Sequence, residues 1–283
     1  MTGSPSAHSR WRGQVALVTG ASSGIGAAAA ERLAGRGLRL ALVARRADRL
    51  EQLAGRLRAA GGHALPVPAD LTQPSGRAAA LETVERELGS IDVLVNNAGF
   101  GWYGHTDEMS PVIGRDMVEL NAAAVVDLTL PVLGQMRRRG HGHIVNVSSI
   151  AGSLPSQGVA VYCATKAFLN AFSSALHREL RGSGIHVSVV KPGPVLSEFY
   201  RTAARKPGGG PVAAERFAVR AERVADRIWS LLNRPRRLAF VPGLLSVTPW
   251  IELMLGGIID RLGPLLLRHR LAPAPVWVRP RRP

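Results

Sequence analysis

Three side chains in the middle of the sequence have the types and spacing needed to move a proton to or from an oxygen atom. Tyr162 and Lys166 are four residues apart, so on a helix they project from the same face, one turn apart. A free tyrosine has a pKa near ~10, and a neighbouring lysine cation favours the phenolate and lowers that pKa. Ser149, thirteen residues before Tyr162, offers a hydroxyl that holds a substrate oxygen. We therefore predict an acid–base site at these three residues.

A glycine-rich turn near the start of the sequence has the pattern of a phosphate-binding loop. The apolar run 15–18 is followed by Thr19 and then by a Gly-x3-Gly-x-Gly segment that opens a helical stretch. A strand, a glycine turn and a helix in this order let backbone N–H groups approach the pyrophosphate of a dinucleotide. The residues expected to bind the cofactor in this turn are Gly20, Ser22, Ser23, Gly24, Ile25 and Gly26.

The choice between NAD and NADP depends on the end of the second predicted strand. NAD-binding sheets carry an acidic residue roughly 20 positions after the glycine turn, where it binds the ribose hydroxyls. This sequence has Arg45 and Arg46 at that place, and arginine suits a 2′-phosphate through charge-assisted hydrogen bonds. The alternative is two solvated arginines before a helix, in a chain where arginine is abundant. We predict NADP(H) as the cofactor.

The chain resembles the short-chain dehydrogenase/reductase family from about residue 13 to about residue 242. The resemblance rests on motifs in the family's order: the turn 19–26, Asn96 to Gly99, Asn121, the Ser149–Tyr162–Lys166 set, and the loop 192–197. The last residue of that loop is more often threonine in the family, and Ser197 keeps the hydroxyl.

The resemblance implies further roles for matching residues. Asn121, Ser149, Tyr162 and Lys166 match the catalytic residues: Tyr162 donates the proton, Ser149 holds the carbonyl oxygen, Lys166 binds the nicotinamide ribose, and Asn121 holds a water behind the lysine. Around the adenine, the middle and the nicotinamide end of the cofactor, the implied contacts come from Asp70, Leu71, Asn97, Ala98, Gly99, Pro192, Gly193, Val195 and Ser197, together with Tyr162 and Lys166.

Alternating strand and helix patterns predict an α/β fold: a Rossmann-type doubly wound parallel sheet of about seven strands in a single domain. The 283 residues divide into a disordered arm (1–12), an NADP-binding oxidoreductase domain (13–242) and an apolar and basic C-terminal extension (243–283). The predicted strands are 15–19, 39–44, 64–69, 91–96, 143–148, 185–190 and 238–241, and His141 and His143 are assigned to a loop. Leu50, Leu53 and Leu57 mark one buried helical face.

Composition limits the other function classes. Cys163 is the only cysteine, which fits a reducing compartment, the cytoplasm, and we interpret it as a small buried filler. No metal site is expected, because the histidines have none of the usual zinc spacings. The formal net charge is +16, but no nucleic-acid-binding motif accompanies it and aromatic residues are few. Arginine on solvated helix faces explains part of this charge.

The C-terminal extension allows two interpretations. Its apolar stretch is interrupted by Glu252, Asp260 and Arg261, so a membrane-spanning helix is not predicted. One interpretation is a pocket lid and oligomer contact. The other is a peripheral patch, residues 243–270, that contacts the inner membrane face, with Trp250 and flanking arginines at the headgroup level. Residues 198–283 carry 16 basic and 6 acidic side chains, which suits an anionic surface.

The function that follows is hydride transfer between nicotinamide and a hydrophobic ketone, aldehyde or secondary alcohol, such as a steroid, retinoid, acyl or xenobiotic carbonyl. Aromatic and apolar residues in the segments that shape the family's pocket suggest this substrate class: Phe100, Trp102, Tyr103, Leu154, Phe199 and Tyr200. The alternative is a catalytically idle NADP-binding scaffold or sensor. The resemblance implies a homodimer or homotetramer built through the helices that carry Asn121 and Tyr162.

Overall fold

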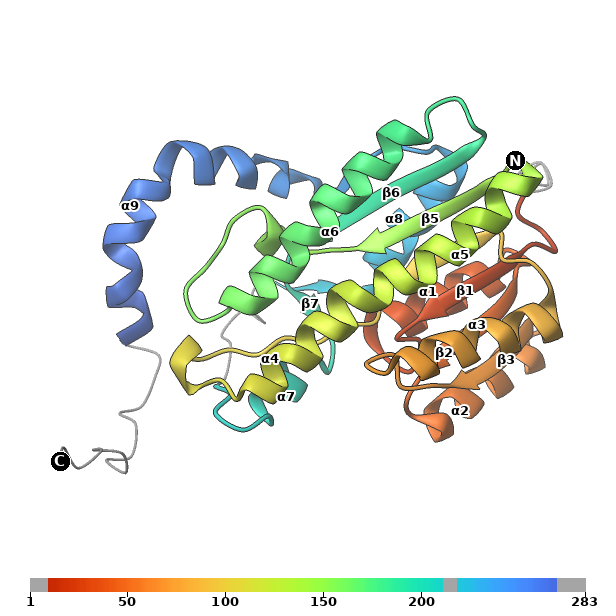
Figure 1. Cartoon of the computed structure of the whole chain (residues 1–283), viewed down its shortest axis with the longest axis horizontal. Helices are drawn as coiled ribbons and strands as arrows, with labels where there is room; N and C mark the ends of the chain where they lie inside the picture. The colour runs from red at the N-terminus through yellow and green to blue at the C-terminus, as the bar shows by residue number, and fades with distance from the viewer. Residues whose placement is uncertain (1–9, 211–217, 269–283) are drawn as a thin grey trace, which may run out of the picture.

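The fold is built around one parallel sheet, seen in a computed structural model that describes residues 10–210 and 218–268, with side chains as far as 262 (Figure 1). Its seven strands are, in spatial order, β3 (His63–Pro68), β2 (Arg39–Ala44), β1 (Val15–Thr19), β4 (Val93–Asn96), β5 (Gly142–Val147), β6 (Ile185–Pro192) and β9 (Leu238–Val241). Every neighbouring pair is parallel. The strand order reverses between β1 and β4, which confirms the predicted doubly wound Rossmann-type sheet.

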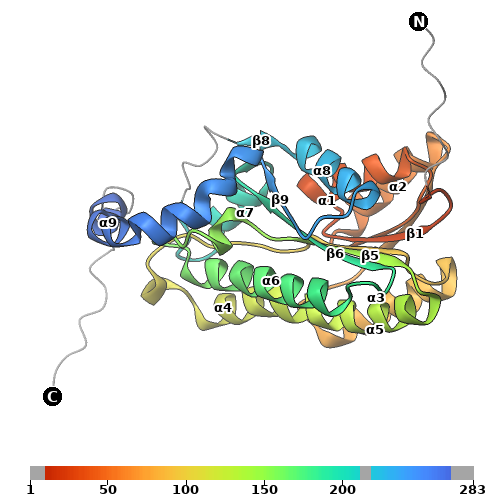
Figure 2. The same cartoon turned by 90° about the horizontal axis from the view of Figure 1, so that it is seen from above.

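Helices cover both faces of this sheet (Figure 2). One face carries α1 (Gly24–Ala34), α2 (Ala47–Ala59) and α8 (Ala221–Asn233), and the other carries α3 (Pro74–Leu88), α5 (Ala124–Arg139) and α6 (Ala160–Glu179). Each layer buries its own apolar core against alternate side chains of the strands. Leu50, Leu53 and Leu57 of α2 are all buried, as their spacing predicted. Because both faces are covered, the strands consist largely of valine, leucine and alanine.

Smaller elements gather at the carboxyl ends of the strands. They include α4 (Pro111–Val118), the π-helical turn η2 (Glu119–Ala123), the 3-10 turn η3 (Ile150–Gly152) and α7 (Phe199–Ala204). Two short strands that the sequence did not predict, β7 (Val195–Leu196) and β8 (Val219–Arg220), pair with each other. The described part of the chain ends with η5 (Gly243–Val247) and α9 (Thr248–Arg268). This edge of the sheet is where ligands bind in doubly wound folds.

Two expectations from the sequence are corrected. His143, which the sequence analysis gave both as the first residue of a strand and as a loop residue, is a buried residue of β5, and its Nε2 lies 2.9 Å from Ser188 Oγ on β6. Trp11, placed in a disordered arm, is buried, and its indole N–H donates to the carbonyl of Leu232 at 3.0 Å. The packed domain therefore begins before residue 13. Residues 1–9 lie outside the described part of the chain.

Candidate active site

The glycine turn between β1 and α1 has the conformation that the sequence predicted. Gly20 and Gly24 have φ angles of +67° and +56°, a region that side chains with a Cβ rarely adopt. Gly26 has a different reason to be glycine, because a Cβ there would lie 2.2 Å from the carbonyl oxygen of Gly20. The backbone of this turn therefore stays open at the N-terminus of α1, where backbone N–H groups bind phosphate.

Thr19, the last residue of β1, fixes the neighbouring segment at the end of β4. Its hydroxyl accepts hydrogen bonds from the backbone N–H groups of Asn97 and Ala98, both at 2.9 Å. The Asn97 side chain donates a hydrogen bond to the carbonyl of Thr19, also at 2.9 Å. These bonds hold the segment 97–99 beside the glycine turn, as the resemblance implied.

Arg46, at the end of β2, reaches across to the glycine turn. Its guanidinium donates to Ser22 Oγ at 2.9 and 3.1 Å and to Ser23 Oγ at 2.8 Å. Arg45 lines the same cavity but is exposed, so Arg46 makes the contacts with the two serines. The structure thus brings a cation and two hydroxyls together where the sequence predicted the binding of a 2′-phosphate.

Two residues of this cluster were missed by the sequence analysis. Glu198, the residue before α7, accepts hydrogen bonds from Arg46 at 2.8 Å and from Arg49 at 2.7 Å. The hydrogen bond from Arg49 is the larger cause, and that from Arg46 the second, of a pKa of the Glu198 carboxyl lowered to about 2. Arg49 carried a weak signal, since it lies one turn after Arg46 on α2. No sequence pattern pointed to Glu198, because it is 152 residues away from Arg46 in the sequence.

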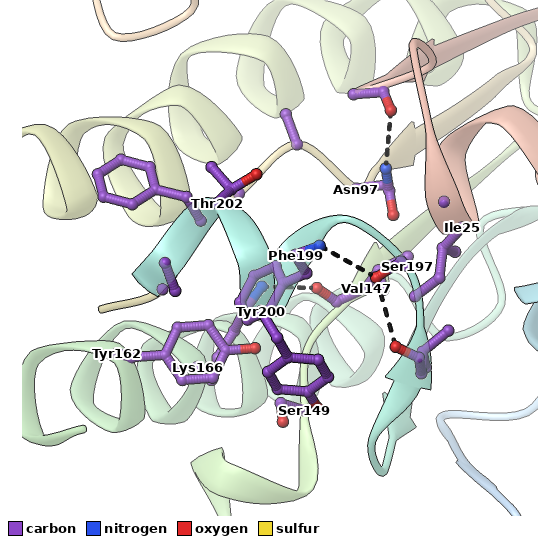
Figure 3. A pocket seen from close by; sticks show the side chains of 18 of the residues that line it. Ile25, Asn97, Val147, Ser149, Tyr162, Lys166, Ser197, Phe199, Tyr200 and Thr202 are labelled. Atoms are coloured by element: carbon purple, nitrogen blue, oxygen red, sulfur yellow. Dashed lines mark hydrogen bonds between the residues drawn. The ribbon is translucent and has the colours of Figure 1, made fainter. Parts of the chain in front are cut away.

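Tyr162, Lys166 and Ser149 converge as predicted (Figure 3). Tyr162 and Lys166 lie on the same face of α6, with Lys166 Nζ 5.7 Å from the centre of the Tyr162 ring. Ser149, the residue before η3, places its hydroxyl near the Tyr162 hydroxyl. Lys166 Nζ donates to the carbonyl of Val147 at 3.0 Å, which fixes the amine at the end of β5. The hydroxyls of Ser149 and Tyr162 and the amine of Lys166 thus meet at one end of the cavity.

The pKa of Tyr162 differs from the expectation. Burial raises this pKa above its usual value, although the neighbouring Ser149 hydroxyl acts in the other direction. The predicted lowering by Lys166 is therefore not found in the protein without a ligand, because removing the phenol from water disfavours its charged form. Burial also lowers the pKa of Lys166 to about 8. Tyr162 is consequently a protonated group at neutral pH, which suits a proton donor.

Asn121 takes a position behind the site. It lies in the π-helical turn η2, and its side-chain amide brackets the backbone of Phe100: Oδ1 accepts from its N–H at 3.0 Å and Nδ2 donates to its carbonyl at 2.9 Å. A second bond joins Nδ2 to Thr165 Oγ1 at 3.1 Å. The side chain of Asn121 therefore positions the loop after β4, and π-helical turns of this kind are frequent at functional sites.

One cavity of about 760 Å³ joins these groups. Of the predicted site residues, Gly26 and Asn121 do not line it: Gly26 packs α1 against the turn, and Asn121 lies behind Phe100. All the others line the cavity: Gly20, Ser22, Ser23, Gly24, Ile25, Arg45, Arg46, Asp70, Leu71, Asn97, Ala98, Gly99, Ser149, Tyr162, Lys166, Pro192, Gly193, Val195 and Ser197. The glycine turn and Tyr162 are thus two parts of one elongated site.

Aromatic side chains surround Tyr162. The Phe199 ring lies 5.5 Å from the Tyr162 ring, and it approaches Gly101 so closely that a Cβ on that glycine would lie 2.9 Å from it. Trp102 is buried, and its indole N–H donates to the carbonyl of Pro207 at 3.1 Å. The predicted pocket residues Phe100, Trp102, Tyr103, Leu154, Phe199 and Tyr200 all line the cavity.

Two neighbours of the site have structural roles. Ser148 Oγ donates to the carbonyl of Lys166 at 3.0 Å, so this serine holds α6 in place. The serine hydroxyl of the site is therefore that of Ser149. Cys163 is buried next to Tyr162, and burial raises the pKa of its thiol. Cys163 is therefore a packing residue, as predicted.

Comparisons with known proteins agree with this site. The sequence profile of the family described as short chain dehydrogenase matches residues 14–207. An uncharacterized oxidoreductase of Myxococcus xanthus is 38% identical over 189 residues, which are 67% of this chain and 75% of that protein. The 3-oxoacyl-[acyl-carrier-protein] reductase FabG of Escherichia coli is 34% identical over 203 residues, 72% of this chain and 82% of that protein. A short-chain dehydrogenase from Sphingobium yanoikuyae, solved with NADPH, is 33% identical, with a TM-score of 0.74 over 94% of this chain and 100% of that one.

Proposed function

This chain belongs to the short-chain dehydrogenase/reductase family, and from this premise we propose that it is an NADP(H)-dependent reductase of lipophilic ketones and aldehydes. The observation that carries the proposal is the convergence of Ser149, Tyr162 and Lys166 in the cavity that also contains the glycine turn and Arg46. The glycine turn would hold the phosphates of the cofactor, and Tyr162 and Lys166 would lie at its nicotinamide end.

The residues present fit NADP(H). The turn at Gly20 and Gly24 has no Cβ atoms between its backbone and the cavity, which lets a pyrophosphate approach the start of α1. Arg46, Ser22 and Ser23 offer a cation and two hydroxyls to a 2′-phosphate. The solved relative from Sphingobium yanoikuyae contains NADPH, which supports the same cofactor for this chain.

The side chains around the reacting oxygen divide the chemistry among them. NADPH, when bound, supplies the hydride to the carbonyl carbon of the substrate. Tyr162, which burial keeps protonated, donates its hydroxyl proton to the carbonyl oxygen as negative charge develops there. Ser149 donates a hydrogen bond to the same oxygen. Lys166, charged below about pH 8, stabilises the phenolate that Tyr162 becomes. Asn121 keeps the loop at Phe100 in place beside them.

The substrate class follows from the aromatic end of the cavity. Phe199 and Tyr200 of α7 and Phe100 of the loop after β4 surround the catalytic hydroxyl with apolar surface. Such surface favours a hydrophobic carbonyl compound, and steroids, retinoids, acyl compounds and aromatic ketones are the classes that we propose to test. A raised Tyr162 pKa favours reduction over oxidation, because oxidation needs the phenolate as base.

An oligomer is part of the proposal. Leu130 on α5 and Phe168 on α6 are 54% and 40% exposed, and both helices lie on the same face of the sheet (Figure 2). The stacked rings of Phe168 and Phe172 widen the apolar surface there. Exposed apolar side chains on adjacent helices are typical of subunit interfaces. We assign the contact of a homodimer or homotetramer to this face.

The proposal is tested by following the oxidation of NADPH and NADH against a panel of steroid, retinoid, acyl and aromatic ketones. We expect turnover with NADPH, and we expect Tyr162→Phe to lower it by about 100- to 10,000-fold without weakening NADPH binding. The matched control is Tyr103→Phe, which removes a hydroxyl from the same cavity and is expected to keep most of the activity. Tight NADPH binding without turnover on any ketone would instead favour the scaffold or sensor.

A further inference from the structure

The C-terminal helix is unusual among the apolar helices of this protein because it is exposed. Two helical stretches of the described chain are long and apolar enough to cross a membrane, Pro111–Arg139 and Gly243–Leu262. Half of the first stretch is buried, so it is a core helix, whereas only 6% of the second is buried. Figures 1 and 2 show α9 running away from the sheet and its covering helices. None of the described residues from 243 to 262 lines the cavity, so this part of the extension does not form its wall.

Five of the six exposed large apolar residues described in α9 lie on one side of the helix, together with Arg261, and the sixth, Leu253, lies on the other side. Successive residues of an α-helix are rotated by about 100°, so Trp250, Met254 and Ile258 follow one another along one face. These three side chains are 63%, 76% and 55% exposed, and Leu255 and Leu262 of the same side are 45% and 51% exposed. The acidic residues Glu252 and Asp260 lie on the other side of the helix. The result is an amphipathic helix whose apolar side contacts water.

The charge of the C-terminal region indicates which kind of partner α9 binds. From Arg261 to the end of the chain there are six arginines and no aspartate or glutamate. The whole chain has a formal net charge of +16. Two C-terminal segments with this charge repel each other, so a second copy is disfavoured at α9, whereas an anionic surface is attracted there. An apolar side with a tryptophan, next to a run of arginines, is the composition of helices that lie in the headgroup region of anionic bilayers.

The helix is fixed to the catalytic domain next to the cofactor loop. Leu245 of η5 packs so closely against Gly193 that a Cβ on that glycine would lie 2.6 Å from Leu245 Cδ1. Thr248 starts α9 with a hydrogen bond from its hydroxyl to the Leu245 carbonyl at 2.8 Å. A surface bound by α9 therefore lies close to the part of the protein that forms the cavity. A lipophilic substrate dissolved in a bilayer would have a short path to it.

We propose that η5 and α9 form an interfacial helix that docks this protein on an anionic phospholipid bilayer. Trp250, Met254 and Ile258 enter the boundary between headgroups and acyl chains, and Arg261 contacts the lipid phosphates. The helix lies in the plane of the interface, because a spanning orientation would place Glu252 in the hydrocarbon region. Docking is independent of catalysis and holds for the protein whether or not it reduces a ketone.

The test is co-sedimentation of the full-length protein with vesicles of phosphatidylcholine alone and of phosphatidylcholine with phosphatidylglycerol. We expect binding to the anionic vesicles to be at least tenfold tighter than to the neutral ones and to fall as salt is raised, because salt screens the arginines. Met254→Gln is expected to weaken binding about tenfold. Leu253→Gln is the matched control: Leu253 is 75% exposed but lies on the side of Asp260, so binding should stay within about twofold.

Other outcomes would overturn the proposal. Equal loss of binding in both variants would mean that the helix has no preferred lipid-facing side. Salt-resistant binding to neutral and anionic vesicles alike would indicate a spanning helix. Absence of vesicle binding, together with self-association in solution that Met254→Gln abolishes, would show that a second copy covers α9.

Discussion

The carboxylate of Glu198 lies 2.8 Å from the guanidinium of Arg46, so the residue before α7 is joined to the residue before α2. The same Arg46 holds Ser22 and Ser23 of the glycine turn. Glu198 precedes Phe199, whose ring packs against Tyr162. A chain of contacts therefore links the group proposed to bind the 2′-phosphate to the aromatic wall of the substrate end. In the protein without cofactor, Glu198 is the anion that pairs with Arg46.

The first prediction concerns this pair. A 2′-phosphate and the Glu198 carboxylate compete for Arg46, so Glu198→Gln should tighten NADPH binding. The expected gain is about two- to fivefold, since ion pairs this exposed contribute less than about 1 kcal/mol. Cofactor affinities from fluorescence titration measure the change, and NADH affinity should stay the same. Glu222→Gln, which removes an exposed carboxylate from α8, is the control. Weaker NADPH binding in the Glu198 variant would mean that the bridge helps to hold the cofactor.

The second prediction concerns Arg46 itself. Arg46→Leu removes the cation that contacts both serines, so NADPH should bind about 10- to 100-fold more weakly, the loss expected for a charge-assisted hydrogen bond. NADH lacks the 2′-phosphate and should bind nearly as before. Arg45→Leu is the matched control, because Arg45 is exposed. If Arg45 proves to be the residue that discriminates between the cofactors, the assignment of Arg46 is wrong.

Residues in local motifs were predictable from the sequence, and contacts between distant segments were not. The glycine turn and the Tyr162–Lys166 pair depend on spacing within one strand–turn–helix unit or one helix, and the structure has both as predicted. Glu198 is brought to Arg46 by the order of the strands in the sheet, which a local pattern does not contain. The burial of Trp11 likewise depends on its contact with Leu232, more than two hundred residues away.

Electrostatics in the site was the least predictable property. The spacing of Tyr162 and Lys166 suggested a lowered tyrosine pKa, but the direction depends on burial, which the surrounding loops determine. Phe199 packs against the Tyr162 ring, and the loop after β4 lies beside both. The π-helical turn at Asn121 was also unexpected, because its sequence continues the helical pattern of α4 and α5.

The third prediction is the pH dependence of reduction. Burial raises the pKa of Tyr162, so this proton donor is available throughout the range from pH 6 to 9. Burial lowers the pKa of Lys166 to about 8, so the amine is charged below pH 8 and loses its charge above it. The value of kcat/KM for the ketone, which reports groups of the free enzyme, should therefore be constant from pH 6 to 7 and fall above about pH 8. Lys166→Met should be slow at every pH and lack this step. A constant value up to pH 10 in the unmodified enzyme would mean that Lys166 remains charged.

The fourth prediction tests the assigned subunit contact. Leu130→Asp places a charge on the outer surface of α5, where burial in an interface would be costly, so the oligomer should dissociate. Light scattering coupled to gel filtration measures the molar mass of the variant and of the unmodified protein. Leu253→Asp, a change at a more exposed leucine of α9, should leave the mass unaltered. An unchanged oligomer in the Leu130 variant would place the contact on another face.

The fifth prediction concerns acid stability and uses His143, which lies outside the proposed site. Ser188 donates its hydroxyl to the carbonyl of Arg236 at 2.7 Å, so it accepts from His143 Nε2, which carries the proton. The other ring nitrogen, Nδ1, is buried without a hydrogen-bond partner in the described structure. Burial lowers the pKa of His143 to about 3, so the folded protein keeps this ring neutral while the unfolded chain takes up a proton below about pH 6.5. Stability from this residue is thus fully present above pH 6.5 and is lost as the pH falls toward 3, by about 3 kcal/mol between pH 7 and pH 4.

In His143→Phe the free energy of unfolding, measured with urea at each pH, should fall less steeply over this range than in the unmodified protein. His63→Phe, a change at an exposed histidine of β3, should keep the original slope, and equal slopes in all three proteins would show that His143 does not cause the acid sensitivity.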